Sequence, residues 1–341
     1  MQTSDFVYEL PENMIAQTPL EPRDSSRLLV LRRDTGAVEH GTFHDIGAYL
    51  HKGDLLVLNQ TRVLPARICA RKTTGGRVEL LLLRRQDALT WQVLVGGKGM
   101  LKGKKIRVEN GPAAEILEEL DGAQRLVRFA EPIEGFLPAA GVMPLPPYIH
   151  EKLDDPERYQ TVYAREAGSA AAPTAGLHFT TRLLEGLASL GVALGYVTLH
   201  VGIDTFAPVT ESDATKHKIH TEWCDLPVAT ASLINKTREA GGRVIAVGTT
   251  SVRTLESAAR YSLLGRSARI APYSGNTDLY ILPGFEFRLV DAMVTNFHLP
   301  KSTLLMLVSA FAGRERVLAA YETAKRQAYR FYSFGDAMLI I

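Results

Sequence analysis

Cysteine is scarce in this sequence, and several widespread sequence motifs are absent from it. Cys69 and Cys224 are the only cysteines among 341 residues, so a disulfide framework cannot organise the chain. No CxxC pair suggests a zinc site, and we expect no metal ligands. The GxGxxG, Walker, HExxH and GxSxG motifs are also missing, which argues against the commonest nucleotide-binding and hydrolase classes.

Long hydrophobic runs are missing as well. The longest, from Thr303 to Ala312, falls far short of the roughly 20 residues that a membrane-spanning helix needs. The first ten residues, MQTSDFVYEL, carry acids where a secretory signal has basic residues, and they include no apolar segment. Hydrophobic residues make up 46% and charged residues 22% of the chain, which is ordinary for a folded globular protein. These features predict a soluble, cytoplasmic protein with no membrane partner.

Charge is unevenly distributed along the chain, whose formal net charge is +2. From Arg62 to His150 there are 14 lysines and arginines against 9 acids, a net charge of +5. The remainder carries 25 basic and 28 acidic residues, a net charge of −3. A basic segment on a mildly acidic body fits a polyanionic partner that is bound by one part of the protein, and it also fits a plain solvated surface.

The basic segment differs from the rest of the chain in its pattern too. Short runs of β character, such as RVELLLLRR and LTWQVLV, are separated by glycine-containing turns. This spacing predicts a small antiparallel barrel or sandwich, in which AEILEEL is either a strand or one to two helical turns. A stiff linker, PLPPYI, follows. We therefore predict an inserted domain at residues 62–150 and a discontinuous α/β core made of residues 1–61 and 151–341.

Strands and helices alternate in the predicted core. The runs DLLVLN (54–59), GVALGYVTLHVG (191–202), RVIAVGTT (243–250) and FRLVDAMVTNFHLP (287–300) are typical of buried strands, and FYSFGDAMLII (331–341) closes the chain as a last strand. Amphipathic runs between them predict helices. Such alternation indicates βα units, and hence a largely parallel sheet or barrel with right-handed crossovers.

One segment, PTAGLHFT at residues 173–180, combines hydroxyls, a glycine, a histidine and an aromatic ring. Leucines at 183, 184, 187 and 190 follow at helical spacing, and Gly191 ends the run. We expect a loop that leads into a helix capped by the Thr180 hydroxyl. The N–H groups of such a helix start favour an anionic ligand group. A capped turn with a packed histidine is the alternative.

Polar residues also follow three of the predicted strands. These exits comprise His200 and Gly202 with Asp204, Thr205 and Phe206; Gly248 to Ser251 with Arg253; and Thr295 to His298. Ligands of parallel α/β proteins bind where the carboxyl ends of strands meet their loops. The three exits and the segment 173–180 therefore predict one shared active site.

Each candidate residue in these exits also has a structural alternative. His178 and His298 can transfer a proton near neutral pH or can be packing residues. Hydroxyls at 249–251 can hold a carboxylate or ribose or can cap a helix. Arg253 can bind a carboxylate or phosphate through two hydrogen bonds or can be solvated on a helix.

Eight motifs occur in order from one end of the chain to the other. They are PRDSSRLLVL, GDLLVLNQTRVLPARI, YQTVYA, PTAGLHF, LHVGIDTFAPV, GTTSVRTLE, TNFHLPKSTLLMLVSAF and FYSFGDAML. In these motifs the chain resembles the S-adenosylmethionine:tRNA ribosyltransferase-isomerase family of the queuosine pathway, over essentially its whole length. The resemblance implies an α/β fold with a distorted parallel barrel-like core and an inserted small antiparallel β-barrel domain.

The resemblance also implies a reaction. Such an enzyme transfers and isomerises the ribosyl moiety of S-adenosylmethionine onto 7-aminomethyl-7-deazaguanine at the wobble position of a tRNA. Epoxyqueuosine-tRNA forms, and adenine and methionine are released. S-adenosylmethionine would be a consumed co-substrate, so no cofactor is expected, and we expect a monomer. The chemistry needs a base near C5′ of the ribose, an acid near adenine, and groups that hold the ribose and the methionine end.

Under this interpretation each candidate residue receives a role. The expected catalytic residues are His178, His298 and Asp204, the last as a ribose ligand. The expected ligands of S-adenosylmethionine and the base are Thr174, Gly176, Phe179, His200, Gly202, Thr205, Phe206, Thr249, Thr250, Ser251, Arg253 and Asn296. Residues 249–251 and Arg253 would hold the methionine carboxylate. The expected tRNA contacts are Arg23, Arg27, Asn59, Arg62, Arg71, Lys98, Lys102, Lys104 and Lys105.

Two other classes remain open on the sequence. A small-molecule α/β-barrel lyase or aldolase would not need the basic segment. A non-catalytic RNA-binding protein would not need four polar strand exits.

Overall fold

The apolar run Leu55–Asn59 forms strand β3 at the centre of a nine-stranded sheet in the computed structural model, which describes residues 1–202, 208–219, 221–262 and 269–341. The chain divides into two units. One comprises Met1–Arg62, Pro146–Glu166 and Ala172–Ile341, and the other comprises Val63–Leu145 and Ala167–Ala171. The predicted insertion ends at residue 150, whereas the main part of the smaller unit ends at Leu145. The smaller unit also includes the segment Ala167–Ala171.

The large sheet lies in the first unit. From edge to edge its strands are β16 (Tyr273–Thr277), β14 (Glu222–Leu226), β13 (Ala193–Leu199), β3, β15 (Val244–Val247), β17 (Ala292–Asn296), β18 (Ala337–Ile340), β1 (Arg27–Leu31) and β2 (Val38–Thr42). β13, β3, β15 and β17 are mutually parallel. β18 pairs antiparallel with β17 and parallel with β1, and the two edges are antiparallel pairs, so the sheet is mixed.

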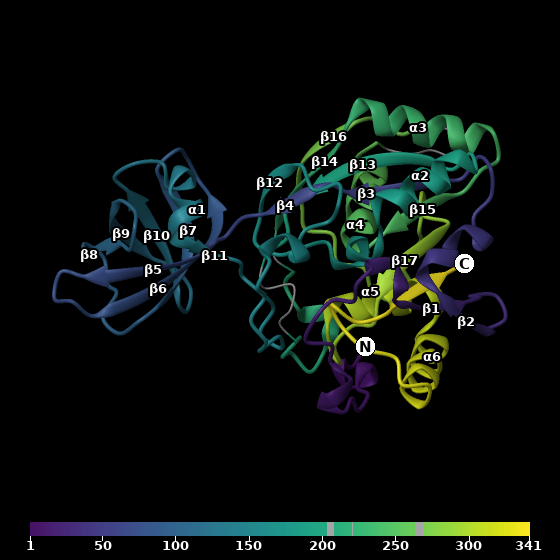
Figure 1. Cartoon of the computed structure of the whole chain (residues 1–341), viewed down its shortest axis with the longest axis horizontal. Helices are drawn as coiled ribbons and strands as arrows, with labels where there is room; N and C mark the ends of the chain where they lie inside the picture. The colour runs from purple at the N-terminus through teal and green to yellow at the C-terminus, as the bar shows by residue number, and fades with distance from the viewer. Residues whose placement is uncertain (203–207, 220, 263–268) are drawn as a thin grey trace. The chain divides into compact units, whose positions relative to one another are not determined.

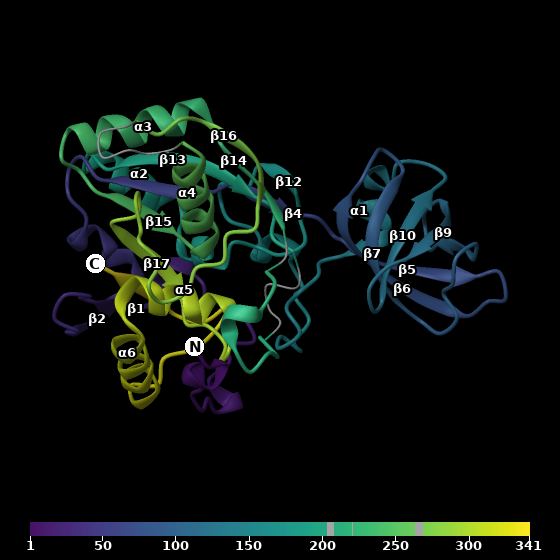
Figure 2. The same cartoon turned by 180° about the vertical axis from the view of Figure 1, so that it is seen from behind.

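Helices cover both faces of this sheet (Figures 1 and 2). The helices of the unit are α2 (Thr181–Ser189), α3 (Val228–Glu239), α4 (Thr249–Tyr261), α5 (Thr303–Ala312) and α6 (Arg314–Arg326). Leu55 and Val57 of β3 join one buried cluster with residues of α3 to α6, whereas Leu56 and Leu58 join a second cluster with residues of α2. Both faces of β3 are therefore buried, because successive side chains of a strand point to opposite faces. The continuous apolar pattern of this strand is thereby explained.

Short 3₁₀ helices complete the first unit. They are η1 (Thr3–Phe6), η2 (Glu12–Met14), η3 (Arg23–Ser25), η4 (Phe43–Tyr49), η6 (Pro156–Tyr159), η7 (Thr174–His178) and η9 (Ala214–Lys216). Phe43 and Ile46 are the buried residues of η4. η7 lies within the segment predicted as a loop, and α2 follows it directly. The Thr180 hydroxyl accepts a hydrogen bond from the Leu183 N–H at 3.1 Å, so the predicted helix cap is confirmed.

The second unit is a closed antiparallel β-barrel. Its strands are β5 (Arg67–Lys72), β6 (Arg77–Arg85), β7 (Thr90–Gly96), β8 (Lys105–Val108), β9 (Ala113–Glu119) and β10 (Gln124–Phe129); β11 (Gly141–Val142), η5 (Ile133–Gly135) and α1 (Leu137–Ala140) complete it. The pairing of β5 with β8 closes the barrel. The AEILEEL run is the strand β9, which settles the choice left open by the sequence.

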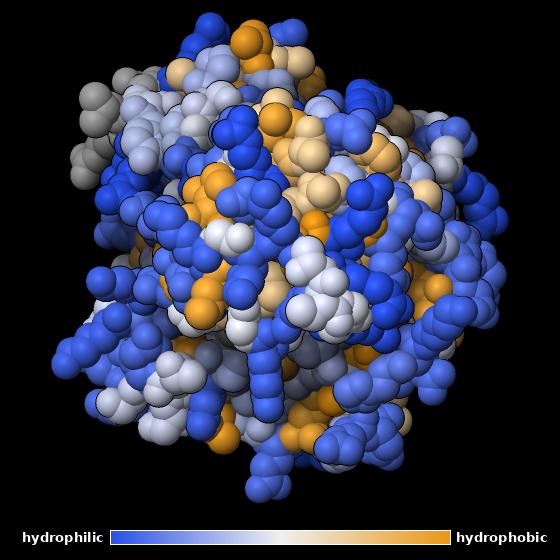
Figure 3. All heavy atoms as spheres, turned by 90° about the vertical axis from the view of Figure 1, so that its left-hand side faces the viewer, coloured by the Kyte–Doolittle hydropathy of each residue, from blue (hydrophilic) through white to orange (hydrophobic). Residues whose placement is uncertain are grey.

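Alternation of side chains fills the barrel. In β8, Ile106 and Val108 are buried while Lys105 and Arg107 are exposed, and Trp91 of β7 is also buried. The surface turned to the viewer in Figure 3 is mostly hydrophilic. β4 (Thr61–Val63) and β12 (Glu166–Ser169) form a separate two-stranded sheet. The predicted α/β class with an inserted antiparallel β-barrel is confirmed.

Candidate active site

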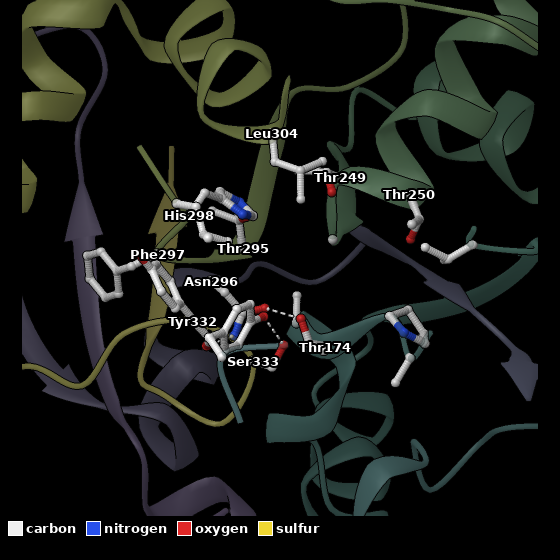
Figure 4. Close-up of a pocket in the computed structure, with 17 residues that line it drawn as sticks. Thr174, Thr249, Thr250, Thr295, Asn296, Phe297, His298, Leu304, Tyr332 and Ser333 are labelled. Atoms are coloured by element: carbon white, nitrogen blue, oxygen red, sulfur yellow. Dashed lines mark hydrogen bonds between the residues drawn. The ribbon is translucent and has the colours of Figure 1, made fainter. Parts of the chain in front are cut away.

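Residues from the segment 173–180 and from the exits at 248–251 and 295–298 line one cavity of about 540 Å³ in the first unit, and Val201 is the one residue near the exit at 200–206 that joins them. Because β13, β3, β15 and β17 run in the same direction, their carboxyl ends lie at one edge of the sheet. The walls of this main cavity come from η7, the segment after β13, the start of α4 and the end of β17. They include Pro173 to Ala175, Val201, Gly248 to Thr250 and Thr295 to His298. Figure 4 shows these side chains around the cavity.

The start of α4 forms one wall because of a glycine. Gly248 has φ of 85°, a conformation that favours glycine, and its N–H bonds to the Val294 carbonyl oxygen at 2.8 Å. The turn brings Thr249 and Thr250 to the cavity. Among the described residues the Thr250 hydroxyl is buried without a hydrogen-bond partner, so it is available to a ligand.

His298 is held rigidly at the end of β17. Its Nε2 lies 2.7 Å from the Thr295 hydroxyl, its N–H donates to the Tyr321 hydroxyl at 2.9 Å, and its carbonyl oxygen accepts from the Tyr8 hydroxyl. The side chain lines the main cavity and is 8% exposed. Burial lowers the pKa of His298 to about 3, so the ring is neutral at pH 7.

His178 occupies a different environment from His298. Its Nδ1 lies 2.7 Å from the Ser26 hydroxyl, and its Nε2 lies 3.3 Å from the Asn296 side-chain nitrogen. That nitrogen also donates to the Tyr332 carbonyl oxygen at 3.3 Å, which fixes the orientation of the amide. Nε2 of His178 is therefore the acceptor, and Nδ1 carries the proton.

These hydrogen bonds let His178 support Asn296 at the main cavity. It does not line the main cavity, but Asn296 does, and the Asn296 oxygen accepts a hydrogen bond from the Thr174 hydroxyl at 2.9 Å. Burial is the largest cause that lowers the pKa of His178 to about 3, and the charges of Arg330 and Arg23 act in the same direction. A chain of hydrogen bonds thus runs from Ser26 through His178 and Asn296 to Thr174.

A second cavity, of about 510 Å³, lies beside the main one, since Leu304 lines both. Gly202 and Arg253 line it, together with Glu222, which the sequence did not single out. Arg253 is separated here from Thr249 and Thr250, with which it was expected to hold a carboxylate.

A third cavity, of about 280 Å³, lies on the far side of His178. Arg23, Arg158 and Arg330 line it together with His178 and Ser26. Desolvation is the main cause that lowers the pKa of Arg23. Among the expected tRNA contacts, Arg23 is the one that belongs to this cationic cavity.

Four expected ligand residues line none of the three cavities. A Cβ atom at Gly176 would lie 2.1 Å from the Tyr163 hydroxyl oxygen, so this glycine makes room for a tyrosine and not for a ligand. Phe179 packs edge-on against Phe43 at a centroid distance of 4.9 Å. The Ser251 hydroxyl donates to the Val247 carbonyl oxygen at 2.8 Å, within its own helix start. Each expectation is corrected by a packing or backbone role.

His200 is the fourth of these residues. Its Nδ1 lies 2.8 Å from the Thr61 hydroxyl, and its ring stacks on Trp223 at a centroid distance of 5.3 Å. Trp223 is 41% exposed, which is unusual for so large a side chain. Asp204, Thr205 and Phe206, expected at the same exit, lie outside the described residues.

The expected tRNA contacts divide into buried and exposed groups. Asn59 is fully buried and bridges β3 to β13: its amide donates to the Leu199 carbonyl oxygen at 3.0 Å and accepts from the N–H groups of Leu199 and Thr61 at 3.1 Å. The expectation that Asn59 contacts tRNA is therefore wrong. Arg27 lies over the Tyr329 ring, 3.8 Å from its centroid, and Arg62 pairs with Glu157.

The remaining candidates lie on the barrel unit. Arg71 is exposed and pairs with Glu109 at 2.9 Å. Lys98, Lys102, Lys104 and Lys105 are all exposed, in and beside the connection between β7 and β8. Their ammonium groups are thus accessible to solvent.

The sequence missed several residues of the main cavity and of the cavity beside it. Tyr148, whose hydroxyl lies 2.7 Å from the Ser333 hydroxyl, lines the main cavity with Tyr332 and Leu304. Nothing in their local pattern distinguishes them from core residues. Glu222 is the first residue of β14, and its local sequence gave no sign that it lines a cavity.

Comparison with known proteins identifies the family. The profile described as queuosine biosynthesis protein matches residues 3–340. The chain belongs to this queuosine biosynthesis family. A relative from Symbiobacterium thermophilum, named S-adenosylmethionine:tRNA ribosyltransferase-isomerase, is 53% identical over 346 residues and covers 100% of both chains. A relative of the same name from Acetivibrio thermocellus is 51% identical over 345 residues, again with 100% of both chains covered.

A solved structure extends the family likeness to three dimensions. The crystal structure of S-adenosylmethionine tRNA ribosyltransferase from Thermotoga maritima is 42% identical in sequence. The match covers 99% of this chain and 100% of the other with a TM-score of 0.58. Family membership therefore extends over both units of the chain.

The described part of the chain lacks two features, a membrane-spanning helix and a cluster of metal-binding side chains. None of its described helices is both long and apolar enough to cross a membrane. Within residues 1–202, 208–219, 221–262 and 269–341, no three His, Cys, Asp or Glu side chains are grouped so that they could hold a metal ion.

Proposed function

We propose that this chain transfers and isomerises the ribosyl moiety of S-adenosylmethionine onto 7-aminomethyl-7-deazaguanine at the wobble position of tRNA. The product is epoxyqueuosine-tRNA, and adenine and methionine are released. The observation that carries this proposal is the full-length identity of 53% with a relative named for this activity. The main cavity supports it, since it gathers hydroxyls, an amide and an imidazole at the carboxyl edge of the sheet.

The reaction needs one group that moves a proton and others that fix the ribose. The sulfonium acidifies the C5′ hydrogens, so that removal of one proton opens the ring and expels adenine. The amine of the base then adds to C4′, the C5′ carbanion so formed closes a carbocycle on the C1′ aldehyde, and the resulting alkoxide displaces methionine from C5′ to leave the epoxide. Hydroxyls of Thr174, Thr249 and Thr250 are suited to hold the ribose and the departing groups, because they lie on rigid elements.

His298 is the better candidate for proton transfer. It lines the main cavity, and a neutral imidazole carries both an N–H donor and an unprotonated nitrogen. His178 acts as a positioning residue, since its acceptor nitrogen is already used by Asn296. The proposed role of Asp204 as a ribose ligand rests on the sequence alone, and so do the proposed ligand roles of Thr205 and Phe206.

The proposed partner is tRNA that carries the 7-aminomethyl-7-deazaguanine base. Exposed lysines at 98, 102, 104 and 105 and the exposed Arg71 would contact its phosphates, and Arg23, Arg27 and Arg62 would contact it from the first unit. S-adenosylmethionine is a consumed co-substrate in this proposal, and no cofactor or metal takes part. The protein would act as a monomer in the cytoplasm, where tRNA is modified.

A test separates this function from its alternatives. The protein is incubated with S-adenosylmethionine and either precursor tRNA or the same tRNA with unmodified guanine, and free adenine is measured. We expect adenine only with precursor tRNA. Adenine formed without tRNA would indicate a small-molecule lyase, and tRNA binding without adenine release would indicate an RNA-binding protein; either result contradicts the proposal.

A further inference from the structure

The third cavity is lined by three guanidinium groups, those of Arg23, Arg158 and Arg330. Among its lining residues in the described part of the chain there is no aspartate or glutamate. Of the three arginines, only Arg23 was expected from the sequence to contact tRNA. The cavity volume of about 280 Å³ is smaller than that of most small-molecule sites, roughly 300–1,000 Å³, so it suits one anionic group better than a whole nucleotide.

The carboxylates that interact with two of these arginines lie outside the cavity lining and are exposed. Glu21 pairs with Arg158, and the charges of Asp155 and Glu157 act on Arg23. All three carboxylates are exposed to solvent. Water and salt screen exposed charges, so these groups offset the positive charge of the cavity only in part.

Asp336 is a buried carboxylate close to Arg330, but the two are only loosely joined. Arg330 Nη2 lies 3.5 Å from Asp336 Oδ1, and Arg330 Nη1 lies 3.5 Å from the Thr18 carbonyl oxygen. Both distances exceed the ordinary range of N–H···O hydrogen bonds. Asp336 accepts shorter bonds from the main-chain N–H groups of Arg27 and Arg330, at 3.0 and 2.8 Å. The Arg330 guanidinium therefore keeps donors for another acceptor, and Asp336 does not depend on it.

A buried donor of Arg158 and the environment of His178 also indicate an anion site. Arg158 Nε is buried and has no hydrogen-bond partner among the described residues, which costs free energy unless a ligand supplies an acceptor. After burial, the charges of Arg330 and Arg23 are the causes that lower the pKa of His178, so both guanidinium groups act on this wall of the cavity. A phosphate group neutralises such a cluster and accepts hydrogen bonds from several guanidinium groups at once.

Ser333 connects the third cavity with the main one, since it lines both. Figure 4 shows it near Thr174 and Asn296. His178, which lines the third cavity, is also bonded to Asn296 of the main cavity. The base and the phosphate of a nucleotide are joined through a single ribose. A nucleotide whose base enters the main cavity therefore brings its own phosphates close to the third cavity.

We infer that the third cavity holds one of the two backbone phosphates that flank the reacting nucleotide of the tRNA, bound by Arg158 and Arg330 together with Arg23. The inference rests on the proposed function for the identity of the RNA, whereas the choice of a phosphate rests on the three arginines. Such a contact selects the register of the RNA, because only the base next to the held phosphate reaches the main cavity.

The test uses precursor tRNAs that each carry one neutral methylphosphonate linkage at a different position of the anticodon loop. Filter binding gives their affinity for the whole protein. We expect one of the two linkages that flank the modified base to weaken binding at least about tenfold, because charge-assisted hydrogen bonds are lost. The slope of log affinity against log salt should flatten by about one at this linkage.

A substitution locates the effect in the third cavity. Arg330→Gln should weaken binding of the all-phosphate tRNA at least about tenfold, and the sensitive methylphosphonate should then lose most of its effect, because the two changes remove the same contact. Arg182→Gln is the matched control and should keep the full methylphosphonate effect. The Arg182 side chain is 84% exposed and lines none of the three cavities.

Each result decides the inference. Equal affinity for every methylphosphonate tRNA, a loss only at linkages remote from the modified base, or an undiminished methylphosphonate effect in folded Arg330→Gln would overturn it. Saturable binding of inorganic phosphate without any linkage effect would assign the cavity to free phosphate and would overturn it too. If Arg330→Gln does not fold, the linkage series on the wild type and on Arg158→Gln decides.

Failure of the proposed function is distinguishable from failure of this inference. A linkage effect on binding without adenine release would contradict the proposed function alone. Adenine release from precursor tRNA without any linkage effect would contradict the inference alone.

Discussion

Replacing Gly176 by alanine tests why this glycine lies in the PTAGLHF segment. An added Cβ would lie 2.1 Å from the Tyr163 hydroxyl oxygen, 2.9 Å from Thr161 Cγ2 and 3.1 Å from Tyr163 Cζ. The first two distances are shorter than real Cβ contacts and the third is tighter than most, and the Tyr163 hydroxyl oxygen is itself buried. Overpacking of this kind costs about 1–3 kcal/mol. We expect Gly176→Ala to lower the thermal unfolding midpoint by several degrees.

A second substitution isolates the cause. Tyr163→Phe removes the hydroxyl oxygen that makes the shortest contact, and this hydroxyl has no hydrogen-bond partner among the described residues. The phenylalanine variant should therefore be near wild type in stability, and the double variant should recover at least half of the loss caused by alanine. The two effects should be non-additive, since the residues touch.

Gly186→Ala is the matched control for the same substitution. Gly186 lies inside α2, and a Cβ there would meet nothing within 4 Å. The change should stabilise the protein by up to about 1 kcal/mol, because alanine favours a helix. Scanning calorimetry or circular dichroism gives the midpoints. A Gly176→Ala variant with wild-type stability and a raised KM for S-adenosylmethionine would refute the packing argument and restore a ligand-facing role.

Three further predictions follow from the site and the barrel. His298→Gln should slow adenine release by about 10²–10⁴-fold, whereas His178→Gln should have a smaller effect, since it acts through Asn296; equal losses in single-turnover assays would contradict this ranking. In the folded protein both histidines have pKa values of about 3, against 6.5 when exposed. The contribution of each histidine to the free energy of unfolding is therefore fully present above pH 6.5 and decreases below it, by about 2 kcal/mol at pH 5. Acid-induced unfolding should accordingly be shallower between pH 6.5 and 5 in either glutamine variant, and an unchanged slope would disprove the assignment. Reversing the four lysine charges within residues 98–105 should weaken precursor-tRNA binding and flatten its salt dependence, measured by filter binding at several salt concentrations; unchanged affinity would leave the arginines of the first unit as the contacts.

Local patterns were sufficient to predict the elements and one cap. The run at Leu55–Asn59 is a buried strand, and Thr180 caps α2, because both depend on neighbours a few residues away. The common edge of the three exits after β13, β15 and β17 followed from the parallel direction of these strands. These predictions needed no knowledge of the strand order.

Contacts between distant residues could not be predicted in the same way. Asn59 had the appearance of a polar strand exit, but its hydrogen bonds go to Leu199, 140 residues away. Arg253 meets Glu222, 31 residues earlier, only because α4 packs near β14. Such pairings depend on the order of the strands. The direction of β18 depends on it too: β18 runs antiparallel to β17, although its apolar pattern resembles that of the parallel strands.

The two tryptophans of the chain are divided between the two units. Trp91 is 4% exposed inside the barrel, and Trp223, in β14 of the large sheet, is 41% exposed and stacked on His200. Each unit thus contains its own intrinsic fluorophore, and the two differ in solvent exposure and hence in emission wavelength. Replacing one of them by phenylalanine leaves a single optical probe, so that the unfolding of the barrel and of the α/β unit can be followed separately in the intact chain.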